Sequence, residues 1–499
     1  MNNSMIVYIL GQIIRLEGLL LVLPCATSLI YQEHEIFSFL VVIAACLVIG
    51  TLMTLKKPEN QTIYLKEGCV ATAFSWLALS IFGCMPFYIS GEIPSFTNAL
   101  FETISGFTTT GASILSDVEV MSHGMMLWRC FTHWIGGMGV LVFLLAVIPM
   151  NSASGTNMNL MKAESPGPSV GKLVPRLKHT ARILYVIYFG MTVLEVVFLL
   201  FGHMPLFDSL CTAFGTAGTG GFGIKNDSFA SYPPYIQWVV TVFMIMFGIN
   251  FNFYYFVLFR NIRKALSMEE VRTYLLIILG AITIITLSLM QTMANIGDAI
   301  RHAAFQVASI ITTTGYASAD FDQWSQMCKT VLVVLMFVGA CAGSTGGGMK
   351  VSRLIIMAKT VVKELGSYFH PKNIKKIKMD GKPVEHEVVR AVNVYFITIM
   401  GIFTASVFLV SIEGRDLVTN FTAVASCLNN IGPGLSQVGP TQNFGGLTGL
   451  SKYVLMFDML AGRLELFPLL LIFNPCIYRD MIMGIFRRIR RRRELRRTN

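Results

Sequence analysis

The sequence predicts an all-α polytopic membrane protein in which two N-terminal transmembrane helices precede four tandem copies of one helical unit. Three observations support this prediction. Hydrophobic residues make up 54% of the 499 residues and charged residues only 13%, whereas a soluble domain carries about a quarter charged residues. Apolar stretches of about 20 residues, long enough to cross a bilayer, recur from end to end. Between the later stretches lie four shorter apolar segments, each followed by a glycine-containing loop.

Ten apolar stretches are expected to span the membrane: 5–30, 37–55, 67–90, 126–149, 181–204, 235–259, 270–293, 328–361, 389–412 and 449–474. Arg15 and Glu17 interrupt the first stretch and no basic segment precedes it, which favours a retained helix over a cleaved signal peptide. If the N-terminus is cytoplasmic and the spans alternate, 31 of the 39 Lys and Arg residues fall on the cytoplasmic side. Because basic residues are retained on that side during insertion, we expect both termini in the cytoplasm.

The remaining composition argues against several classes of function. The formal net charge of +11 follows from this one-sided distribution and does not indicate nucleic-acid binding. The basic tail, residues 487–497, is expected to contact anionic membrane lipid. The ten cysteines and eight histidines are dispersed, without a CxxC pair or a His/Cys cluster, which argues against disulfides and a zinc site. HExxH, GxSxG and Walker A sequences are absent, so no catalytic residues are assigned and the chain is not expected to be an enzyme.

Four loop sequences repeat along the chain. Short apolar segments of about ten to thirteen residues lead into Thr/Gly-rich or Asn/Gly-rich stretches: ALFETISGFTTTGAS (99–113), SLCTAFGTAGTGGF (209–222), AAFQVASIITTTGYAS (303–318) and TAVASCLNNIGPGLS (422–436). Aligned on their cores, the sequences place one glycine in register, at Gly111, Gly220, Gly315 and Gly432. Such repetition indicates one structural unit used four times.

The short segments are predicted to be re-entrant half-helices, because so few residues cannot cross a bilayer. Irregular backbone at membrane depth must be buried in protein or line water, and four loops satisfy this together by converging on one axis. The sequence therefore predicts four M1–pore-helix–M2 repeats around a pseudo-four-fold pore. Rings of backbone carbonyls suit a dehydrated cation, and glycine permits the conformations that they require. Ordinary helix-capping turns are the alternative for any single loop, but the two TTTG copies and the common placement of all four favour the pore.

Two further features lie in the second spans of the later repeats. Residues 339–348 contain five glycines, and no helix persists through them because each glycine costs about 1 kcal/mol relative to alanine. Arg463 lies within the last span, where an ionisable side chain is costly and faces protein or water. The alternatives are a close-packing kink at the glycines and a structural pair of Arg463 with Asp458, Glu465 or Glu195.

These loops and motifs resemble the Trk/Ktr/HKT superfamily of potassium transporters over residues from about 65 to 475. GACAGSTGGGMK (339–350) stands where the family has a glycine-rich intramembrane loop below its filter, and DMLAGRLELFPLL (458–470) contains the family's membrane-embedded arginine. The two extra N-terminal spans and a cytoplasmic hairpin expected at 370–387 are similar to the TrkH/TrkG branch rather than the shorter KtrB branch.

The resemblance implies a pore subunit for potassium uptake across the bacterial inner membrane. It also implies a homodimer and a cytosolic nucleotide-binding regulatory subunit of the TrkA type. K⁺ would be the transported ion, no cofactor would be covalently bound, and nucleotide would act only through the partner protein.

The loops and the resemblance together assign the site residues. A K⁺-binding selectivity filter is expected at Thr109, Thr110, Gly111, Thr219, Gly220, Thr313, Thr314, Gly315, Asn430, Ile431 and Gly432. A movable gating loop is expected below it, at Gly343, Ser344, Thr345, Gly346, Gly347 and Gly348. Arg463 is expected to form a positive barrier in the pore. Because the second and fourth loops depart from TTTG, we expect imperfect four-fold symmetry and looser selectivity against rubidium and sodium.

The chain is accordingly divided into six parts. They are two extra N-terminal transmembrane helices (1–60), pore repeat 1 (61–160), pore repeat 2 (161–265), pore repeat 3 with a broken second helix and the hairpin (266–385), pore repeat 4 (386–480) and the basic cytoplasmic tail (481–499).

A secondary transporter that couples potassium or another solute to sodium or protons is the alternative function. Such proteins also use broken helices around sites at the bilayer midplane, although usually with inverted or two-fold repeats. The sequence leaves passive and coupled transport open; no intramembrane carboxylate stands out as a proton relay, which favours a gated channel. Glu102, in the first half-helix, is expected to be solvated or to face the outer vestibule, where it would concentrate cations.

Overall fold

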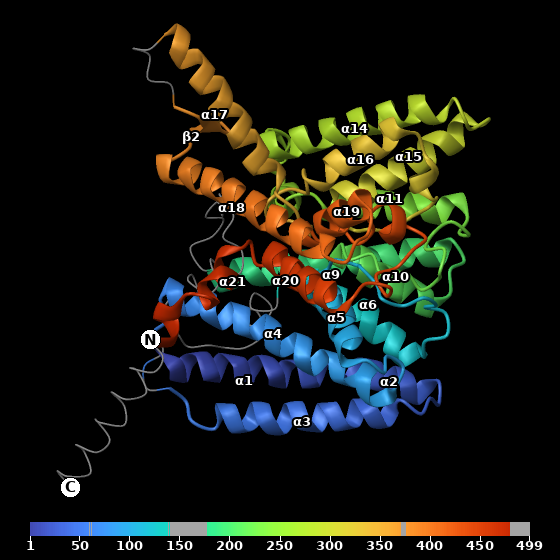
Figure 1. Cartoon of the computed structure of the whole chain (residues 1–499), viewed down its shortest axis with the longest axis vertical. Coiled ribbons are helices and arrows are strands. Elements are labelled where there is room, and N and C mark those ends of the chain that lie inside the picture. Colours follow the sequence, from blue (N-terminus) through green and yellow to red (C-terminus); the bar gives the residue numbers. More distant parts are fainter. Residues whose placement is uncertain (59, 61, 138, 140–176, 371–375, 480–499) are drawn as a thin grey trace, which may run out of the picture.

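The computed structural model describes the chain except for residues 59, 61, 138, 140–176, 371–375 and 480–499 (Figure 1). Helices provide nearly all of the regular structure of the described residues, and most of them run across the molecule side by side (Figure 1). The predicted all-α fold is therefore confirmed. The predicted tail 481–499 and most of residues 138–149, the end of the fourth predicted span, lie outside the described residues.

Among the described residues, each of the four repeats begins with a long helix, continues with a shorter one and then has a second helix, which is broken in the last three repeats. The first helices are α4 (Leu65–Ser90), α9 (Leu177–Phe201), α14 (Glu269–Leu289) and α18 (His386–Ser411). The shorter helices occupy the predicted half-helix positions: α5 (Phe96–Phe107), α10 (Leu206–Gly218), α15 (Ile296–Ile311) and α19 (Leu417–Leu428). The second helices are α6 (His123–Gly137), α11 (Pro234–Phe247) with α12 (Phe251–Leu258), α16 (Gln326–Met336) with α17 (Val351–Phe369), and α20 (Gly449–Arg463) with α21 (Phe467–Ile472).

Six helical segments of the described residues are long and apolar enough to cross a membrane, or seven if α11 and α12 count as one span. They are residues 3–30, the helix α3 (Ile36–Thr54), and the first helix of every repeat. The second helices of the last three repeats are divided into shorter pieces. The predicted spans are thus of two kinds, and the irregular backbone is concentrated in the second helices.

The predicted span over 235–259 is not one straight helix but a bent pair. Helices α11 and α12 meet at an angle of 92°. Asn250 lies at the bend, and its side chain accepts a hydrogen bond from the backbone N–H of Asn252 at 2.9 Å. This contact caps the N-terminus of α12, so a new helix begins there. In the third repeat, by contrast, the gap between α16 and α17 falls at the glycine-rich residues, as predicted.

The N-terminal helices pack through small residues. Helix α1 (Asn3–Leu20) faces α3, and a methyl group at Gly50 would overlap the Arg15 side chain and lie 2.7 Å from the carbonyl oxygen of Gly11. A methyl group at Gly18 would lie 2.9 Å from the Cβ atom of Cys46. Glycines at such positions allow helices in a membrane to approach closely.

The loop between α2 (Val22–Ile30) and α3 joins the N-terminal helices to the first repeat. Glu33 in this loop accepts hydrogen bonds from the backbone N–H groups of His123 (2.6 Å) and Gly124 (3.0 Å), at the start of α6. A carboxylate is favourable there because it satisfies free amides and faces the positive end of the helix dipole.

The remaining elements are small. A hairpin follows α17, where the sequence predicted one: β1 (Lys378–Met379) pairs antiparallel with β2 (Lys382–Pro383). Asp380 and Gly381 both have positive φ, 50° and 76°, the signature of a tight two-residue hairpin turn. The other elements are α13 (Ile262–Leu266) and the 3₁₀ turns η1 (Phe321–Gln323) and η2 (Ser436–Val438).

Replacing Gly50 with Ala should push α1 away from α3, because the added methyl group meets backbone as well as side-chain atoms. Overpacking of this kind costs about 1–3 kcal/mol, so the melting temperature of the detergent-purified protein should fall. Gly401→Ala in α18 is the matched control, since its methyl group would have no neighbour within 4 Å. Equal melting temperatures for the two variants would contradict the role given to Gly50.

Candidate functional site

The four shorter helices end in the same hydrogen-bonded turn. In the first repeat, the N–H of Thr109 donates to the carbonyl of Gly106 at 3.1 Å, and that of Thr110 to Ser105 at 2.9 Å. This is the Schellman arrangement, which satisfies the last carbonyls of a helix. The equivalent amide pairs, at distances of 2.8–3.3 Å, belong to Thr219 and Gly220, Thr313 and Thr314, and Asn430 and Ile431.

This turn fixes the register of the loops and shows that the sequence alignment is wrong by one residue in the second repeat. One left-handed residue per loop, with φ between 54° and 60°, ends the helix: Thr109, Thr219, Thr313 and Asn430. Two residues later comes a glycine with φ between 79° and 100°: Gly111, Gly221, Gly315 and Gly432. Gly221 is therefore the equivalent glycine, and Gly220 takes the place of Thr110. Because these glycines are adjacent in the second loop, sequence letters alone could not distinguish them.

Each of these four glycines packs against the backbone of the next loop. A methyl group on the glycine would overlap or closely approach a carbonyl oxygen in every case, in the pairs Gly111 with Gly220, Gly221 with Thr314, Gly315 with Ile431, and Gly432 with Thr110. The contacts run from the first loop to the second, third and fourth and back to the first. The four loops, here named the ring, are thus a closed structure that only residues without a Cβ atom can form.

The left-handed residues of the ring are strained. Threonine is β-branched and rarely adopts positive φ, yet Thr109, Thr219 and Thr313 all do so and are completely buried. Such conformations cost of order 1–3 kcal/mol each and persist only where the surroundings impose them. In the first and third loops, paired threonine hydroxyls contribute to that constraint: Thr108 with Thr110 at 2.8 Å, and Thr312 with Thr314 at 2.7 Å.

On one side the ring opens into a cavity of about 180 Å³ that all four equivalent glycines line. The charged side chains at its lining are Arg129 and Lys225. Lys225 has partners outside the four loops: its Nζ atom donates to Ser231 Oγ at 3.2 Å and lies 4.2 Å from the centre of the aromatic side chain of Tyr232.

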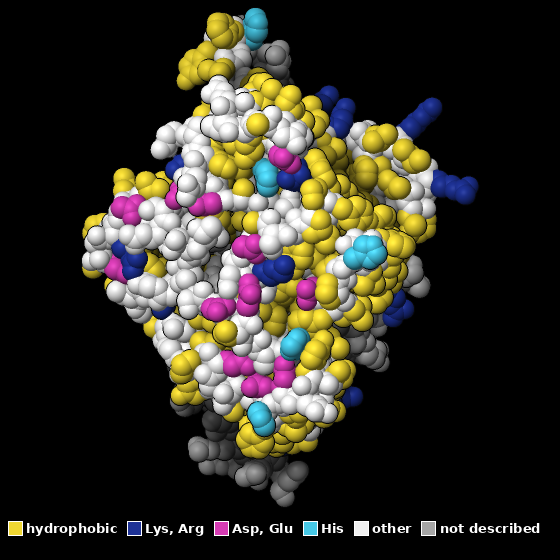
Figure 2. Space-filling model, turned by 90° about the vertical axis from the view of Figure 1, so that its right-hand side faces the viewer, with side chains coloured by type: hydrophobic (Ala, Val, Ile, Leu, Met, Phe, Trp, Pro, Cys, Tyr) yellow, Lys and Arg dark blue, Asp and Glu magenta, His cyan; other side chains and the backbone are white. Residues whose placement is uncertain are grey.

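Asn226 joins the chain segment after the first loop of the ring to the segment after the second loop. Its side chain accepts from the N–H of Val118 and donates to Asp117 Oδ1, both at 2.8 Å. The hydrogen bond from Asn226 lowers the pKa of Asp117, so this exposed carboxylate is charged at neutral pH. On the face at the right of Figure 1, Asp and Glu side chains are spread across the polar middle (Figure 2).

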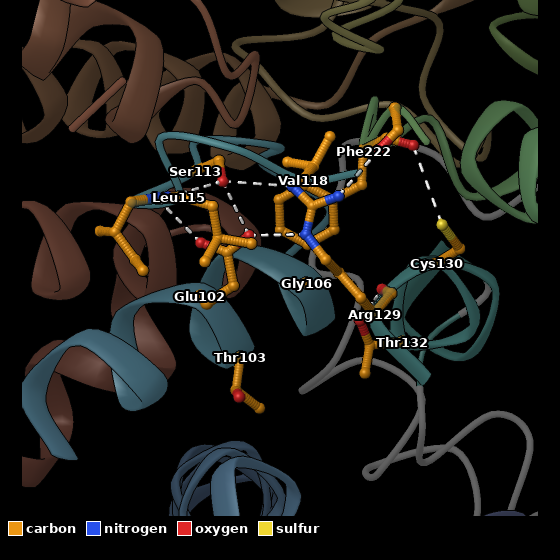
Figure 3. A network of polar contacts seen from close by, with 12 residues as sticks. Glu102, Thr103, Gly106, Ser113, Leu115, Val118, Arg129, Cys130, Thr132 and Phe222 are labelled. Atoms are coloured by element: carbon orange, nitrogen blue, oxygen red, sulfur yellow. Dashed lines mark hydrogen bonds and ion pairs between the residues drawn. The ribbon is translucent and has the colours of Figure 1, made fainter. Parts of the chain in front are cut away.

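A buried ion pair supports the ring from the side of this cavity (Figure 3). Arg129 Nε donates to Glu102 Oε1 at 2.7 Å, and both side chains are at most 2% exposed. Glu102 also accepts from Ser113 Oγ and from the N–H of Ile114, each at 2.9 Å, while Arg129 donates to the Gly223 carbonyl at 3.0 Å. The expectation that Glu102 is solvated or faces the vestibule is therefore wrong: its carboxylate ties the first loop to Arg129 of α6, and Arg129 in turn binds the second loop.

His133 makes a second bridge between repeats. Its ring is fully buried, with Nδ1 2.8 Å from the carbonyl of Gly106 and Nε2 accepting from the N–H of Phe222 at 3.2 Å. A methyl group at Gly220 would overlap this imidazole, which explains why glycine occurs at the position that Thr110 takes in the first loop.

On its other side the ring meets the loop between α16 and α17, residues 337–350, here named the glycine-rich loop. The N–H of Gly347 donates to Thr313 Oγ1 at 2.6 Å. Methyl groups at Gly346 and Gly347 would lie 2.8 Å and 2.7 Å from the carbonyl oxygens of Thr312 and Asn429. The ring is therefore enclosed between the cavity and this loop.

Arg463 connects the ring, the glycine-rich loop and α6. Its guanidinium donates to Thr109 Oγ1 at 3.2 Å, to the Thr345 carbonyl at 2.9 Å, and to the carbonyls of Gly136 and Gly137. Two carboxylates that the sequence offered as partners have contacts of their own: Glu465 forms an ion pair with Arg353, and Asp458 accepts from Ser406 at 2.7 Å.

The unpredicted bend between α11 and α12 supports the glycine-rich loop. The N–H of Cys341 donates to the carbonyl of Gly248 at 3.1 Å, and the N–H of Phe251 to that of Gly343 at 3.0 Å. Thr345 Oγ1 donates to the carbonyl of Phe247 at 3.3 Å. The bend exposes backbone groups that the loop of the next repeat then satisfies.

The structure thus brings together all the residues that the sequence assigned to the filter, the glycine-rich loop and the barrier. The sequence analysis missed Gly221, the Glu102–Arg129 pair and the bend at Asn250. A signal existed for Arg129, because an arginine in a predicted span needs a carboxylate nearby.

Comparisons with known proteins agree with this geometry. The TrkH family, described as cation transport proteins, matches residues 35–484. The Trk system potassium uptake protein TrkH of Halomonas elongata is 32% identical over 486 residues, which cover 96% of this chain and all of that protein. Trk system potassium uptake protein TrkG of Escherichia coli is 31% identical with the same coverage. The crystal structure of the potassium transporter TrkH from Vibrio parahaemolyticus superimposes with a TM-score of 0.85 at 29% identity, covering 95% of this chain and 99% of that one. These relatives are named as transport proteins, not enzymes.

Replacing Glu102 with Ala should strongly destabilise the protein, because Arg129 would remain buried without its carboxylate. Breaking a buried pair in this way costs about 3–5 kcal/mol, so the melting temperature in detergent should fall markedly. Asp298→Ala is the control: Asp298 pairs with Arg301 at 2.7 Å but is 41% exposed, and exposed pairs contribute about 0–1 kcal/mol. Similar falls in melting temperature for the two variants would contradict the larger contribution assigned to the buried pair.

Proposed function

Because the chain belongs to the TrkH family of cation transport proteins, we propose that it is a pore subunit that takes up potassium through the ring of its four loops. It is a transport protein rather than an enzyme. The observation that supports a pore most directly is the cyclic order of the glycine contacts, which a bundle of unrelated helix caps would not produce.

The ring offers the ligands that a dehydrated K⁺ ion requires. The proposed filter consists of three consecutive residues in each loop, the last of which is the equivalent glycine. It contains all the filter residues assigned from the sequence and, in addition, Gly221. Backbone carbonyls replace the water shell of the ion, and the C-terminal ends of four helices add negative potential. In the fourth loop, Asn430 Nδ2 donates to Thr110 Oγ1 at 2.9 Å, so its amide ties the first and fourth loops together.

The glycine-rich loop is proposed to gate this pore. Residues 343–348 lie against the ring on the side away from the cavity, where an ion leaving the filter must pass. Hydrogen bonds from α11, α12 and Arg463 hold the loop there, and its glycines give the backbone freedom to move.

Arg463 is proposed to act as a positive barrier beside the gate. A guanidinium is always charged, and its contact with Thr109 Oγ1 places this charge next to the ring, where it opposes a passing cation. Its bond to the Thr345 carbonyl also couples the barrier to the position of the loop.

The assembly is proposed from the family resemblance. It comprises a homodimer in the bacterial inner membrane with cytoplasmic termini and a cytosolic TrkA-like nucleotide-binding regulator, and the division into six parts at the boundaries given above is retained. Helix α17 projects from the body of the molecule with the hairpin beside it (Figure 1). Tyr368 and Phe369 near its end are more than 80% exposed, which supports a protein contact at this helix.

Gly315→Ser tests the ring. A side chain there would be strained at φ 88° and would overlap the carbonyl of Ile431, so we expect weaker or sodium-permeable flux. The measurement is potassium and rubidium flux into proteoliposomes with sodium as competitor, beside the control Gly280→Ser, where an added Cβ atom would have no neighbour within 4 Å.

Unchanged potassium-over-sodium selectivity in Gly315→Ser would contradict the four-loop filter. If the unaltered protein shows no flux, addition of the cytosolic regulator distinguishes a closed pore, which then conducts, from a carrier of another solute, which still does not pass rubidium.

Arg463→Ala tests the barrier. Removal of the charge should raise potassium conductance several-fold, measured as single-channel current or initial rubidium flux. Arg415→Ala is the control, because Arg415 pairs with Glu413 in the connection before α19 and is not one of the residues of the four loops. If Arg463→Ala instead reduces the yield of folded protein and leaves conductance unchanged, the residue has a structural role only.

A further inference from the structure

Glu270 is a buried carboxylate that is not part of the proposed filter, gating loop or barrier. It lies in the first turn of α14 and is 3% exposed. The neighbouring Glu269 is part of the surface, where it forms an ion pair with Lys359 at 2.5 Å. From the sequence alone, both residues look like acidic side chains at the positive end of a helix.

One oxygen of Glu270 accepts hydrogen bonds from the glycine-rich loop and from the start of the helix that follows it. Oε1 accepts from the N–H of Ala342 at 2.7 Å and from that of Ser352 at 3.1 Å. Ala342 precedes the proposed gating residues, whereas Ser352 is the second residue of α17 and carries one of the free amides of that helix end. A single carboxylate thus ties the glycine-rich loop to the start of α17.

The second oxygen reaches the bend in the preceding repeat. Asn250 Nδ2 lies 3.5 Å from Glu270 Oε2, while Asn250 Oδ1 caps α12. Glu270 therefore contacts three segments near the ring: the glycine-rich loop, the start of α17, and the bend between α11 and α12.

Hydrogen bonds to a charged acceptor are stronger than neutral ones, and an amide left unsatisfied in a buried site is costly. Loss of this carboxylate would free two amides at once, one in the glycine-rich loop that covers the ring and one at the start of α17. The adjacent bonds from Cys341 and Phe251 would remain, so the loop would loosen without the surrounding helices being separated.

We propose that Glu270 is a positioning residue that holds the glycine-rich loop closed across the pore, through its hydrogen bonds to Ala342 and Ser352. The assignment rests on the proposed pore function. It couples the loop to α14 and to the second repeat, so that displacement of α17 by a partner would act on the same carboxylate.

The test compares Glu270→Ala and Glu270→Gln with the control Glu269→Ala, each in the full-length protein. Rubidium flux into proteoliposomes without any partner protein is the first measurement. Glu270→Ala should raise this basal flux by about tenfold or more, since tenfold is the factor expected for losing just one of the two hydrogen bonds to this charged acceptor. Glu270→Gln keeps an acceptor oxygen for both amides and should restore most of the closure.

A second measurement uses the native Cys341, which lies in the loop and is fully buried, as are Cys328 and Cys427 outside it. The proteins are treated with a small thiol-reactive methanethiosulfonate, and the modified peptides are identified by mass spectrometry. Selective labelling of Cys341 in Glu270→Ala, with the other two cysteines still protected, would support the assignment because general unfolding would expose all three.

Flux and Cys341 labelling in Glu270→Ala equal to those of Glu269→Ala would overturn the assignment. So would simultaneous labelling of all three cysteines, which would give Glu270 a general structural role. If the unaltered protein and all variants fail to conduct even with the regulator, the proposed function fails; the labelling pattern then still decides whether Glu270 positions the loop.

Discussion

The close approach of four backbone segments is the constraint on which the rest of this structure depends. At each contact a carbonyl oxygen lies 1.8–2.8 Å from the position that the Cβ atom of any residue other than glycine would take, and four such contacts in cyclic order close the ring. The helices α5, α10, α15 and α19 must therefore end at one depth and in one geometry, which their common Schellman turns provide. The strained left-handed threonines are tolerated because this arrangement leaves them no other conformation.

A ring of irregular backbone inside a membrane needs partners for its polar groups, and charged side chains from other elements supply many of them. Arg129 and Glu102 satisfy groups of the first and second loops, and Arg463 satisfies carbonyls at the end of α6 and in the glycine-rich loop. Each of these buried charged side chains thus forms several hydrogen bonds, which is the condition under which burial of a charge is tolerated.

The sequence predicted the four half-helices with their glycine-containing loops, the break at the glycine-rich residues and the position of Arg463 in the last span, because these depend on local signals: apolar length, TTTG motifs and glycine density. It did not predict features that depend on contacts between repeats. The register of Gly221 over Gly220 is set by Thr314 on one side and by His133 on the other, and neither is adjacent in sequence. The bend at Asn250 lies in an apolar stretch that reads as continuous, and Glu102 could be placed only once Arg129 was seen beside it.

The same contacts explain why a nearly symmetric ring is covered on one side by a loop, the glycine-rich loop, that comes from the third repeat. Among the described residues, the first helices of all four repeats are long, whereas the second helices differ, and that of the third repeat is interrupted by a 14-residue gap, between Met336 and Val351. That gap needs acceptors and donors at membrane depth, and the bend of the second repeat, Glu270 and Arg463 provide them from three separate elements. A straight α11–α12 helix would keep its backbone groups for itself and leave the loop without these bonds. The ring can therefore stay close to four-fold while its cover depends on departures from symmetry in the neighbouring repeats.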